Sequence, residues 1–295
     1  MITIMTPTYN RAYILHKAYR SLKNQTTFDF EWIIIDDGSS DNTQELVNQW
    51  IRECTDFDII YKKQPNGGKH RAINRAVQMA RYEWFLILDS DDQLTENAVE
   101  MIHSWIDDVY GRDDIVGVAG LKGSVDHVIG ERLKKDYIDA TNLERKKYGL
   151  LGDKAEVYKT IILKQYPFPE FEGENFLRES AVWDRIAQDG LKLRWYNDVI
   201  YMCEYIEDGL TKNTNTETYK RNFEGFTYCS KLFIETHSWL FSMYKCGDFY
   251  KVAKEKGLTM RMAAQILNVG IFPFAVGVLI FHLWQWIKKW YRKSI

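Results

Sequence analysis

The sequence of 295 residues predicts an α/β fold in which a mostly parallel sheet is flanked by helices. One observation behind this prediction is that, over about the first hundred residues, short apolar runs rich in β-forming residues alternate with helical patterns. Another is that two of these runs end in carboxylates, WIIIDD (32–37) and FLILDSDD (85–92). Ligands bind outside the carboxyl ends of strands in an open parallel sheet, so we expect both acidic clusters to face one crevice.

Each of the first four strands is expected to precede a helix. The strands are expected at Ile2–Met5, Trp32–Ile35, Ile59–Lys62 and Trp84–Leu88, and the helices at Ala12–Leu22, Asn42–Arg52, Lys69–Ala80 and Glu96–Ile106. Asp41, with Gln44 three residues later, has the pattern of a capping box at the start of the second helix. After Val116 the alternation weakens, and Pro167 and Pro169 indicate a loop.

The later part of the chain is expected to be richer in helix. A helical pattern runs from about 179 to 188, and Leu193–Tyr201 has the composition of a further strand. Residues 216–260 are aromatic and helix-like. We therefore expect a helical region to follow the sheet.

The composition disfavours several classes of protein. A net charge of −2 gives no general attraction for nucleic-acid phosphates, so no nucleic-acid partner is expected. Without a CxxC pair or an HExxH motif, a zinc ribbon or a disulfide framework is not indicated, and a reducing, cytosolic compartment fits best. NGGK (66–69) lacks the spacing of a P-loop and no GxGxxG is present, which disfavours a dehydrogenase or a kinase-like nucleotidase. The amino-terminal MITIMTPTYNRAY is expected to be the first strand of the fold and not a signal peptide.

The pair Asp89 and Asp91 predicts a metal-bridged diphosphate. Close carboxylates that are partly desolvated repel each other or take up a proton, and a divalent cation removes this cost. Hard oxygen ligands suit Mg²⁺ or Mn²⁺, which often complete their shell with substrate phosphates. The alternative is a solvated turn in which Thr95 caps the next helix. A calcium loop is rejected, because Leu94 stands where that loop needs glycine and a strand precedes it.

Four blocks, in this order and at this spacing, form a pattern typical of one enzyme family: TPTYNR (6–11), DDGSSDNT (36–43), NGGKHRAINRA (66–76) and LDSDD (88–92). The chain, from residue 2 to about 110, resembles the amino-terminal half of glycosyltransferase family 2, the inverting enzymes of GT-A fold. The resemblance implies a Rossmann-like GT-A sheet flanked by helices with a helical C-terminal extension, in a member of the bacterial surface-polysaccharide type.

The resemblance also implies roles for individual residues in binding the donor. Those implied to line the nucleotide pocket or to lie around the donor are Pro7, Thr8, Tyr9, Arg11, Asp36, Asp37, Gly68, Lys69, Asn74, Asp89 and Ser90. Of these, Asp36 and Asp37 would hydrogen-bond the base or the ribose. Asp91 would be the principal ligand of Mn²⁺ or Mg²⁺ and Asp89 a second. A third metal ligand is expected in YIEDGLTKN (205–213), where Glu207 and Asp208 are the candidates and Asp208 is assigned.

On the acceptor side, the resemblance rests on FLRESAVWDRIA (176–187). Glu179 stands four residues before Trp183 and six before Arg185, which is the spacing of the family's catalytic carboxylate, while Arg178 stands where the family has a preceding Glu. Glu179 is therefore implied to be the general base. The alternative is that Glu179 is a first-turn helix residue favoured by the helix dipole and that Trp183 is ordinary core. Asp153 is expected to face the acceptor or the donor sugar.

The expected function is the transfer of a sugar, by single displacement with inversion, from a nucleotide-diphosphate donor to a hydroxyl of a glycan or a polyprenol-linked glycan. A UDP-sugar is the expected donor. Two alternatives stay open. One is a catalytically silent protein that binds nucleotide sugars, and the other is a sugar-phosphate nucleotidyltransferase, although the Gly-rich first loop of that class is absent. We expect a nucleotide-sugar-binding half at 1–115, an acceptor-binding half at 116–215 and a helical region at 216–295.

The last segment is expected to associate with a membrane. VGIFPFAVGVLIFHLWQWI (269–287) is an apolar window nearly as long as the roughly 20 residues that span a bilayer, and KKWYRK follows it. Tryptophans beside lysines and arginines are typical of a membrane interface. We expect residues 269–293 to attach the protein, without crossing, to the cytoplasmic inner face of the cell membrane. The alternative is a C-terminal helix packed on the protein's own core.

Overall fold

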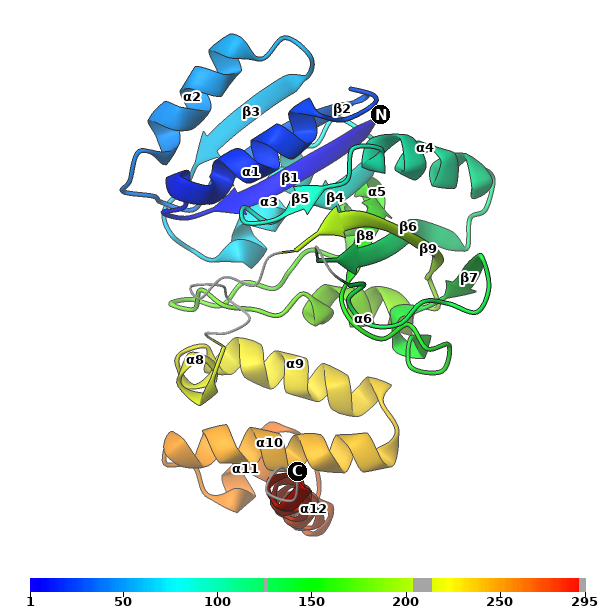
Figure 1. The fold of residues 1–295 in the computed structure, drawn as a ribbon. Coiled ribbons are helices and arrows are strands. Elements are labelled where there is room, and N and C mark those ends of the chain that lie inside the picture. Colours follow the sequence, from blue (N-terminus) through cyan, green and yellow to red (C-terminus); the bar gives the residue numbers. More distant parts are fainter. Residues whose placement is uncertain (125–126, 204–213, 292–295) are drawn as a thin grey trace. The chain divides into compact units, whose positions relative to one another are not determined.

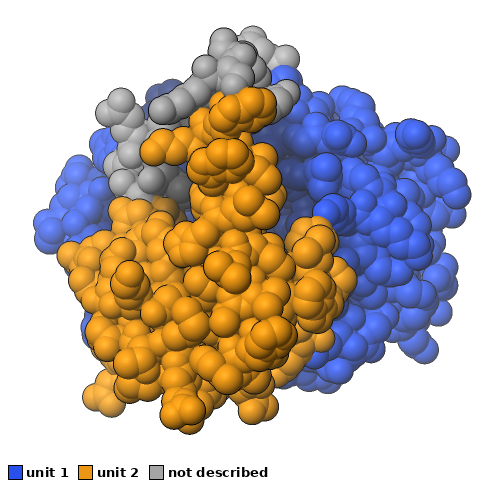
Figure 2. Space-filling view, turned by 90° about the horizontal axis from the view of Figure 1, so that it is seen from below, with its two compact units in different colours: residues 1–168, 186–207 blue, residues 169–185, 208–295 orange. Residues whose placement is uncertain are grey.

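The computed structural model describes residues 1–124, 127–203 and 214–291, and the chain divides into two compact units. Unit 1 comprises residues 1–168 and 186–207, and unit 2 comprises residues 169–185 and 208–295 (Figure 2). The sequence placed all of 116–215 in one half of a single domain. Residues 169–185 cluster with the C-terminal helices in unit 2, and the expected division into donor-binding half, acceptor-binding half and helical region stays a prediction.

Unit 1 is built around one large sheet. Its strands are β1 (Ile2–Thr8), β2 (Phe30–Asp36), β3 (Asp58–Lys63), β4 (Trp84–Ile87), β5 (Gln93–Leu94), β6 (Ile115–Gly123), β7 (Tyr137–Ala140), β8 (Lys154–Lys159) and β9 (Lys192–Met202). Their order is β3-β2-β1-β4-β8-β6-β9-β5, with β7 paired to β9. β3, β2, β1 and β4 run parallel to one another. β8 runs antiparallel to both β4 and β6, so β6 and its parallel neighbour β9 run in the same direction as β4.

The order of the strands creates a switch point between β1 and β4. From β1 the chain proceeds to β2 and β3 on one side and then returns to place β4 on the other side. At such a point the connections leave in opposite directions and open a crevice at the carboxyl ends of the strands. The predicted fold class, a mostly parallel sheet flanked by helices, is thus confirmed (Figure 1).

Helices cover the sheet of unit 1. They are α1 (Ala12–Lys23), α2 (Thr43–Glu53), α3 (Lys69–Met79), α4 (Ala98–Asp108) and α5 (Thr160–Gln165), with a short 3₁₀ turn η1 (Asn142–Glu144). Leu15, Val47 and Ile102, from α1, α2 and α4, share one core with Trp32 and Ile34 of β2. Burial of these large apolar side chains is the main force that holds helices to sheet. Helix α3 contacts β1 and β2.

The second helix begins one residue later than the sequence indicated. Asp41 does not close a capping box with Gln44, and its carboxylate instead serves two helix starts. One oxygen accepts the Thr43 N–H at 3.1 Å and the other accepts the Ala12 N–H at 3.0 Å. Burial alone would raise the pKa of Asp41, but these bonds and one from the Thr43 hydroxyl outweigh it and lower that pKa. Asp41 thus ties the starts of α1 and α2 together.

Unit 2 is helical. Its helices are α8 (Thr216–Arg221), α9 (Phe223–Thr236), α10 (Trp239–Glu255), α11 (Met260–Ile266) and α12 (Ile271–Tyr291), and α6 (Ser180–Gln188) spans the division between the units. Helices α10 and α12 approach closely at two glycines. A Cβ on Gly247 would lie 2.2 Å from the Phe281 Cβ, and one on Gly277 would lie 2.4 Å from the Met243 carbonyl oxygen. Only glycine permits this crossing.

Helix α12 has two different faces. Phe274, Val278 and Phe281, at helical spacing, are buried in the core of unit 2. Other apolar residues of the helix are exposed, and those more than half exposed are Phe272, Leu279, Leu283, Trp286 and Trp290. In the described part of the chain one stretch, Ile271–Trp290, is long and apolar enough to cross a membrane, and 22% of its most apolar window is buried. The helix therefore packs on its own unit along one side only.

Candidate functional site

The carboxyl ends of β1, β2 and β4 meet at one edge of the sheet in unit 1. Thr8 pairs with Asp36, and the Asp37 N–H donates to the Thr8 carbonyl at 2.8 Å. Met5 pairs with Ile87, and the Leu88 N–H donates to the Met5 carbonyl at 2.8 Å. The loops TPTYNR, DDGSS and LDSDD are consequently neighbours, as the rule for parallel sheets predicts.

Asp36 is fully buried at the end of β2, and its carboxylate supports the loop that follows. One oxygen accepts the Ser39 N–H at 2.7 Å and the other accepts the Tyr61 hydroxyl at 2.5 Å. Burial and the bond to Asp36 raise the pKa of Tyr61 above its ordinary value, so the hydroxyl stays a donor. The hydrogen bond predicted between Asp36 and a base or ribose stays a prediction. A ligand atom that bonded Asp36 would use an oxygen that already accepts from Ser39 or Tyr61.

Asp37 holds the glycine turn that precedes α3. Its Oδ1 accepts the Gln64 amide at 2.8 Å and the Gly67 N–H at 2.9 Å, and its Oδ2 accepts the Gly68 N–H at 2.7 Å. Gly68 has a φ of +93°, which residues with a side chain rarely adopt. Because α3 begins at Lys69, the bonds of Asp37 to the glycine turn also fix the backbone position of Lys69. Contact of Asp37 with the base or ribose also stays a prediction.

The loop after β1 is fastened to the loop after β2. Asn10 has a φ of +51°, a region that costs a non-glycine residue free energy, and such strain clusters at functional sites. Its N–H donates to the Ser39 hydroxyl at 2.8 Å, and its Oδ1 accepts the Ser40 N–H at 2.7 Å. Beside it, Tyr9 is half exposed. Within the described residues the Thr8 hydroxyl is buried and has no hydrogen-bond partner, so it can bond a polar atom of a ligand.

Two ion pairs join the loop after β4 to its neighbours. Arg11 Nη1 lies 3.0 Å from Asp91 Oδ2, and Lys69 Nζ lies 2.5 Å from Asp89 Oδ1. Burial would raise the pKa of Asp89, but the charges of Lys69, Lys122 and Arg11 outweigh it and lower that pKa. Three of the predicted donor residues and the predicted metal ligand thus form one cluster of alternating charges.

Asp92, to which the sequence assigned no role, adds negative charge to this cluster. It is buried, and burial together with the charges of Asp89 and Asp91 raises the pKa of Asp92 to about 7. The Tyr201 hydroxyl accepts the Asp89 N–H at 2.9 Å and donates to the Asp92 carboxylate. Burial is the larger cause of the raised pKa of Asp92, and the two neighbouring carboxylates add to it.

Lys122 and Tyr201 are members of the site that sequence reasoning missed. The Lys122 ammonium lies 4.2 Å from the centre of the Tyr201 ring, a cation–π geometry, and its charge reaches Asp89 and Asp92. Both residues stand at the carboxyl ends of β6 and β9, which run in the same direction as β4. The rule that ligands bind at the carboxyl ends of parallel strands applies to these residues too. It could not be used because the sequence does not show the order of the later strands.

The acidic turn fits a hard divalent cation. Asp89 and Asp91 offer carboxylate oxygens at the end of β4, and the buried Asp92 lies in the same turn. No group of three or more His, Cys, Asp or Glu side chains among the described residues is arranged as a metal site. Asp208, the predicted third ligand, lies outside the described residues. Two protein ligands with phosphates and water are a usual arrangement for Mg²⁺.

Four further predictions fall in unit 1. Pro7 is buried within β1 and Ser90 is buried in the turn after β4. The Asn74 amide bonds the backbone of Phe168 in both directions, each at 2.9 Å, and so fastens α3 to the loop that follows α5. Asp153 is exposed immediately before β8. The roles predicted for these residues toward donor or acceptor stay predictions.

The predicted acceptor-side residues Arg178, Glu179 and Trp183 belong to unit 2. Helix α6 begins at Ser180, and the Glu179 carbonyl accepts the N–H groups of Val182 and Trp183 at 2.9 and 3.2 Å. Glu179 is thus the residue that precedes the first turn, a place where the helix dipole favours a carboxylate. Trp183 is buried, and Arg178 donates to the Tyr219 hydroxyl.

Comparison with protein families and curated sequences gives one consistent result. The model described as Glycosyl transferase family 2 matches residues 3–161, more than half of the chain. A "GalNAc(5)-diNAcBac-PP-undecaprenol beta-1,3-glucosyltransferase" of Campylobacter jejuni is 26% identical over 196 residues, 64% of this chain and 60% of its own. The "Poly(ribitol-phosphate) beta-N-acetylglucosaminyltransferase TarP" of Staphylococcus aureus is 34% identical over 151 residues, 47% and 44% of the two chains.

A third relative shows how partial these matches are. A "Chondroitin synthase" of Pasteurella multocida is 40% identical over 101 residues, which are 34% of this chain and 10% of that protein. The chain thus spans between a tenth and about three fifths of the length of these curated relatives. Activities named for whole relatives are therefore not assigned to this chain by similarity alone.

Solved structures show the same fold. S. aureus TarS 1–349 in complex with UDP-GlcNAc superposes with a TM-score of 0.65 at 16% identity, covering 99% of this chain and 92% of that one. A mannosyltransferase from Pyrobaculum calidifontis in complex with GDP-Man and Mn²⁺ gives a TM-score of 0.56 at 17% identity, covering 95% and 84%. At such low identities the likeness concerns the fold, not the ligands.

Proposed function

This chain belongs to glycosyl transferase family 2, and on that premise we propose that it moves a sugar from a UDP-sugar to a hydroxyl of a glycan or lipid-linked glycan, with inversion. The observation that supports this proposal most strongly is the charge cluster at the switch point of the sheet. Asp89 and Asp91, each paired with a cation, stand at the place where parallel sheets bind ligands. The complex of TarS with UDP-GlcNAc and the undecaprenol-linked acceptor in the name of the Campylobacter relative support the donor and acceptor classes.

The chain's own cations are proposed to bind the donor diphosphate. Arg11 and Lys69 now pair with carboxylates, and Lys122 lies over the Tyr201 ring. A nucleoside diphosphate brings negative charge to the same rim, and charge-assisted bonds to phosphate oxygens are stronger than neutral ones. The buried Thr8 hydroxyl and the half-exposed Tyr9 offer a polar and an aromatic contact for the nucleoside.

Asp89 and Asp91 are proposed to hold Mn²⁺ or Mg²⁺ together with the donor. When bound, the cation neutralises charge that develops on the departing diphosphate. Asp208 stays the proposed third ligand. Tyr201, by accepting the Asp89 N–H and donating to Asp92, fixes the turn from which both ligands project.

Glu179 is proposed to be the general base. The acceptor hydroxyl oxygen would form a bond to the anomeric carbon on the face opposite the diphosphate, the bond from that carbon to the diphosphate oxygen would break, and the hydroxyl proton would pass to the Glu179 carboxylate. Positioned bases typically contribute about 10²–10⁴-fold to the rate. Glu179 is partly exposed, so an acceptor can reach it.

A donor-binding experiment tests this proposed function. We expect UDP to raise the melting temperature in the presence of Mn²⁺, and one of a panel of UDP-sugars, including UDP-glucose and UDP-GlcNAc, to be split with release of UDP. Lys122→Met, which keeps most of the length of the side chain and removes the charge, is expected to weaken UDP binding about 10–100-fold, since one charge-assisted bond contributes roughly 1.5–3 kcal/mol.

Lys62→Met, which removes an exposed charge on β3, is the matched control for Lys122→Met and is expected to bind UDP like the wild type. Binding without release from any donor would favour the alternative of a catalytically silent nucleotide-sugar-binding protein. A protein that forms UDP-sugar from UTP and a sugar phosphate would be a nucleotidyltransferase. Absence of any UDP or UDP-sugar binding would contradict the proposed donor class.

The exposed side of α12 is proposed to attach the protein to the inner face of the cell membrane. Phe272, Leu279 and Trp286 present exposed apolar surface, and Lys288 lies over the Trp284 ring at 3.6 Å. Aromatic rings beside lysines suit the lipid headgroup region. Because the other side of the helix packs on α10, an attachment parallel to the surface fits better than a span.

Sedimentation with vesicles tests the attachment. We expect the protein to bind vesicles that contain anionic lipid, and Leu279→Glu with Trp286→Glu to weaken this binding at least about tenfold, since each buried apolar side chain contributes roughly 1.5–3 kcal/mol. Ile161→Glu, at an exposed apolar residue of unit 1, is the control and should bind vesicles normally. Equal loss in the double variant and in Ile161→Glu, or no binding by the wild type, would refute the attachment.

A further inference from the structure

The segment that leads to the proposed base has no regular structure of its own. Residues 174–178 lie in neither helix nor strand, and Glu179 follows directly. A segment of this kind is placed by the contacts it makes, because no ladder of backbone bonds fixes it. Its contacts within unit 2 are therefore informative about how the base is held.

Glu174 caps a helix that lies far away in the sequence. Its buried carboxylate accepts the N–H of Glu224 at 2.6 Å and the N–H of Gly225 at 2.8 Å. These are first-turn donors of α9, which have no partner inside the helix. A carboxylate at this end also complements the helix dipole. The start of the segment is thus fixed to the start of α9 by two charge-assisted bonds.

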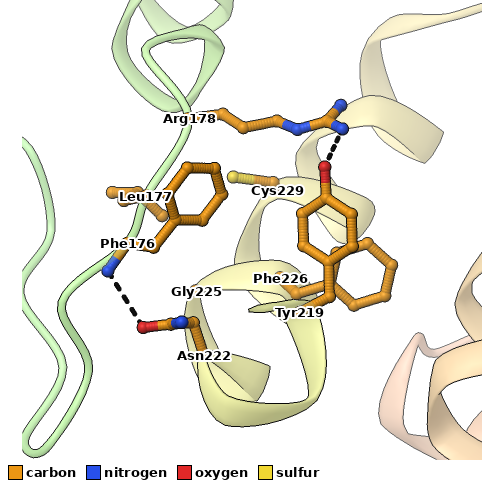
Figure 3. Close-up of a pocket in the computed structure, with 8 residues that line it drawn as sticks. All are labelled: Phe176, Leu177, Arg178, Tyr219, Asn222, Gly225, Phe226 and Cys229. Atoms are coloured by element: carbon orange, nitrogen blue, oxygen red, sulfur yellow. Dashed lines mark hydrogen bonds between the residues drawn. The ribbon is translucent and has the colours of Figure 1, made fainter. Parts of the chain in front are cut away.

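Asn222, between α8 and α9, holds the next two residues. Its Oδ1 accepts the N–H groups of Asn175 and Phe176 at 2.8 and 2.9 Å, and its Nδ2 donates to the Thr218 carbonyl at 2.8 Å. Figure 3 shows the bond to Phe176 at the edge of the pocket that these residues line. Asn222 is buried, so water does not compete for these bonds.

The end of the segment lies against the same helices. A Cβ on Gly225 would stand 3.0 Å from Leu177 Cδ1 and 3.1 Å from Glu174 Oε2, so a side chain at residue 225 would push these two side chains away from α9. Arg178 donates to the Tyr219 hydroxyl, and its guanidinium lies 5.0 Å from the centre of that ring. Every residue from 174 to 178 is thus in contact with α8, α9 or the residue between them.

We propose that the α8–α9 junction positions the general base, with Glu174 and Asn222 as the positioning residues. The inference rests on the proposed function, in that Glu179 is taken as the base. A base acts only when its oxygen is within hydrogen-bond reach of the acceptor hydroxyl, and a misplacement of about 1 Å costs on the order of 10²-fold. The helical unit then has a part in catalysis besides attachment, because it determines where Glu179 stands.

Substitutions at Asn222 test the proposal without touching Glu179. Asn222→Ala removes both bonds to the segment, and we expect kcat for UDP release from the donor to fall about 10–100-fold with the donor Kd unchanged. Asn222→Asp keeps the oxygen that accepts both N–H groups but sets its second oxygen against the Thr218 carbonyl, so it is expected to recover only part of the lost rate. Gly225→Ala, which displaces Leu177 and Glu174 without removing a bond, is expected to lower kcat in the same way.

Two controls separate positioning from stability. Asn215→Ala removes the side chain that caps α8 through the Thr218 N–H at 3.1 Å. In the described part of the chain Asn215 makes no hydrogen bond to residues 174–178, so kcat is expected to stay near the wild-type value. The double variant Asn222→Ala with Glu179→Gln is expected to be no slower than Glu179→Gln alone, because Asn222 acts through Glu179.

The outcomes distinguish this inference from the proposed function. Wild-type kcat in both Asn222→Ala and Gly225→Ala, with Glu179→Gln inactive, would overturn the positioning role and leave the base in place. An equal fall in Asn215→Ala would also overturn it, since a general loss of stability would then explain the effect. Full turnover by Glu179→Gln would remove the base itself, and the positioning role with it.

Discussion

Replacement of Glu179 by glutamine is expected to slow sugar transfer about 10²–10⁴-fold and to leave UDP-sugar binding within about twofold of the wild type. The amide has nearly the shape of the carboxylate but cannot take the proton of the acceptor hydroxyl. The donor-side residues belong to unit 1 and Glu179 belongs to unit 2, and the substitution leaves every residue of the charge cluster that is proposed to hold the donor unchanged. The measurement is UDP release under single-turnover conditions, with the donor Kd from titration.

Glu172→Gln is the matched control for Glu179→Gln. Glu172 is an exposed carboxylate earlier in the same stretch of unit 2, so its replacement makes the same chemical change without an assigned role in catalysis. We expect it to transfer sugar at the wild-type rate. Near-normal turnover by Glu179→Gln would remove Glu179 from the mechanism, and a donor Kd raised by the same factor as the rate is lowered would make it a donor-binding residue instead.

The first half of the fold could be predicted because its strands and helices carry strong local signals. Ile33, Ile34 and Ile35 form a continuous β-branched run that is buried in the sheet, and apolar residues at helical spacing mark α1. The acidic loops follow these strands at once, so a rule about strand ends was enough to bring Asp36 and Asp89 to one edge.

What the side chains do at that edge could not be predicted in the same way. Asp37 accepts bonds from Gln64, Gly67 and Gly68, which lie about thirty residues along the chain, and no local pattern shows that the turn takes up both of its oxygens. Lys122 was missed because the later strands are out of sequence order, and the antiparallel β8 decides which of their ends face the crevice.

The sequence also could not show to which unit the segment before Glu179 belongs. Local patterns indicate that residues around Pro169 form a loop, but which core a loop packs against depends on a few long-range bonds. Here Glu174 and Asn222 supply those bonds, and neither residue is part of a recognisable motif. For α12 the structure shows packing of one side on the core of unit 2 and exposure of the other side, and attachment of the exposed side to a membrane stays a proposal.

Asp91→Asn is expected to lower UDP release about 10²–10³-fold and to abolish the dependence of the rate on added Mn²⁺, since loss of one group that stabilises developing charge has effects of this size. Chelation by EDTA is expected to have the same effect on the wild type, and readdition of Mn²⁺ to reverse it. Asp92→Asn, the same change in the same turn at a residue without an assigned ligand role, is expected to keep activity within about fivefold.

The pH dependence of Mn²⁺ binding is a second, independent test of whether the acidic turn binds the cation. With no cation bound, the pKa of Asp92 is raised to about 7 by burial and by the charges of Asp89 and Asp91, so the turn takes up a proton as the pH falls through 7. A cation competes with that proton, so Mn²⁺ affinity measured in the presence of UDP should rise between about pH 6 and pH 8. In Asp92→Asn this rise should be smaller, because the titrating group is gone. A chelated wild-type enzyme that still runs at full rate, or an Asp91→Asn variant that binds Mn²⁺ normally, would place the cation elsewhere or exclude it from the reaction.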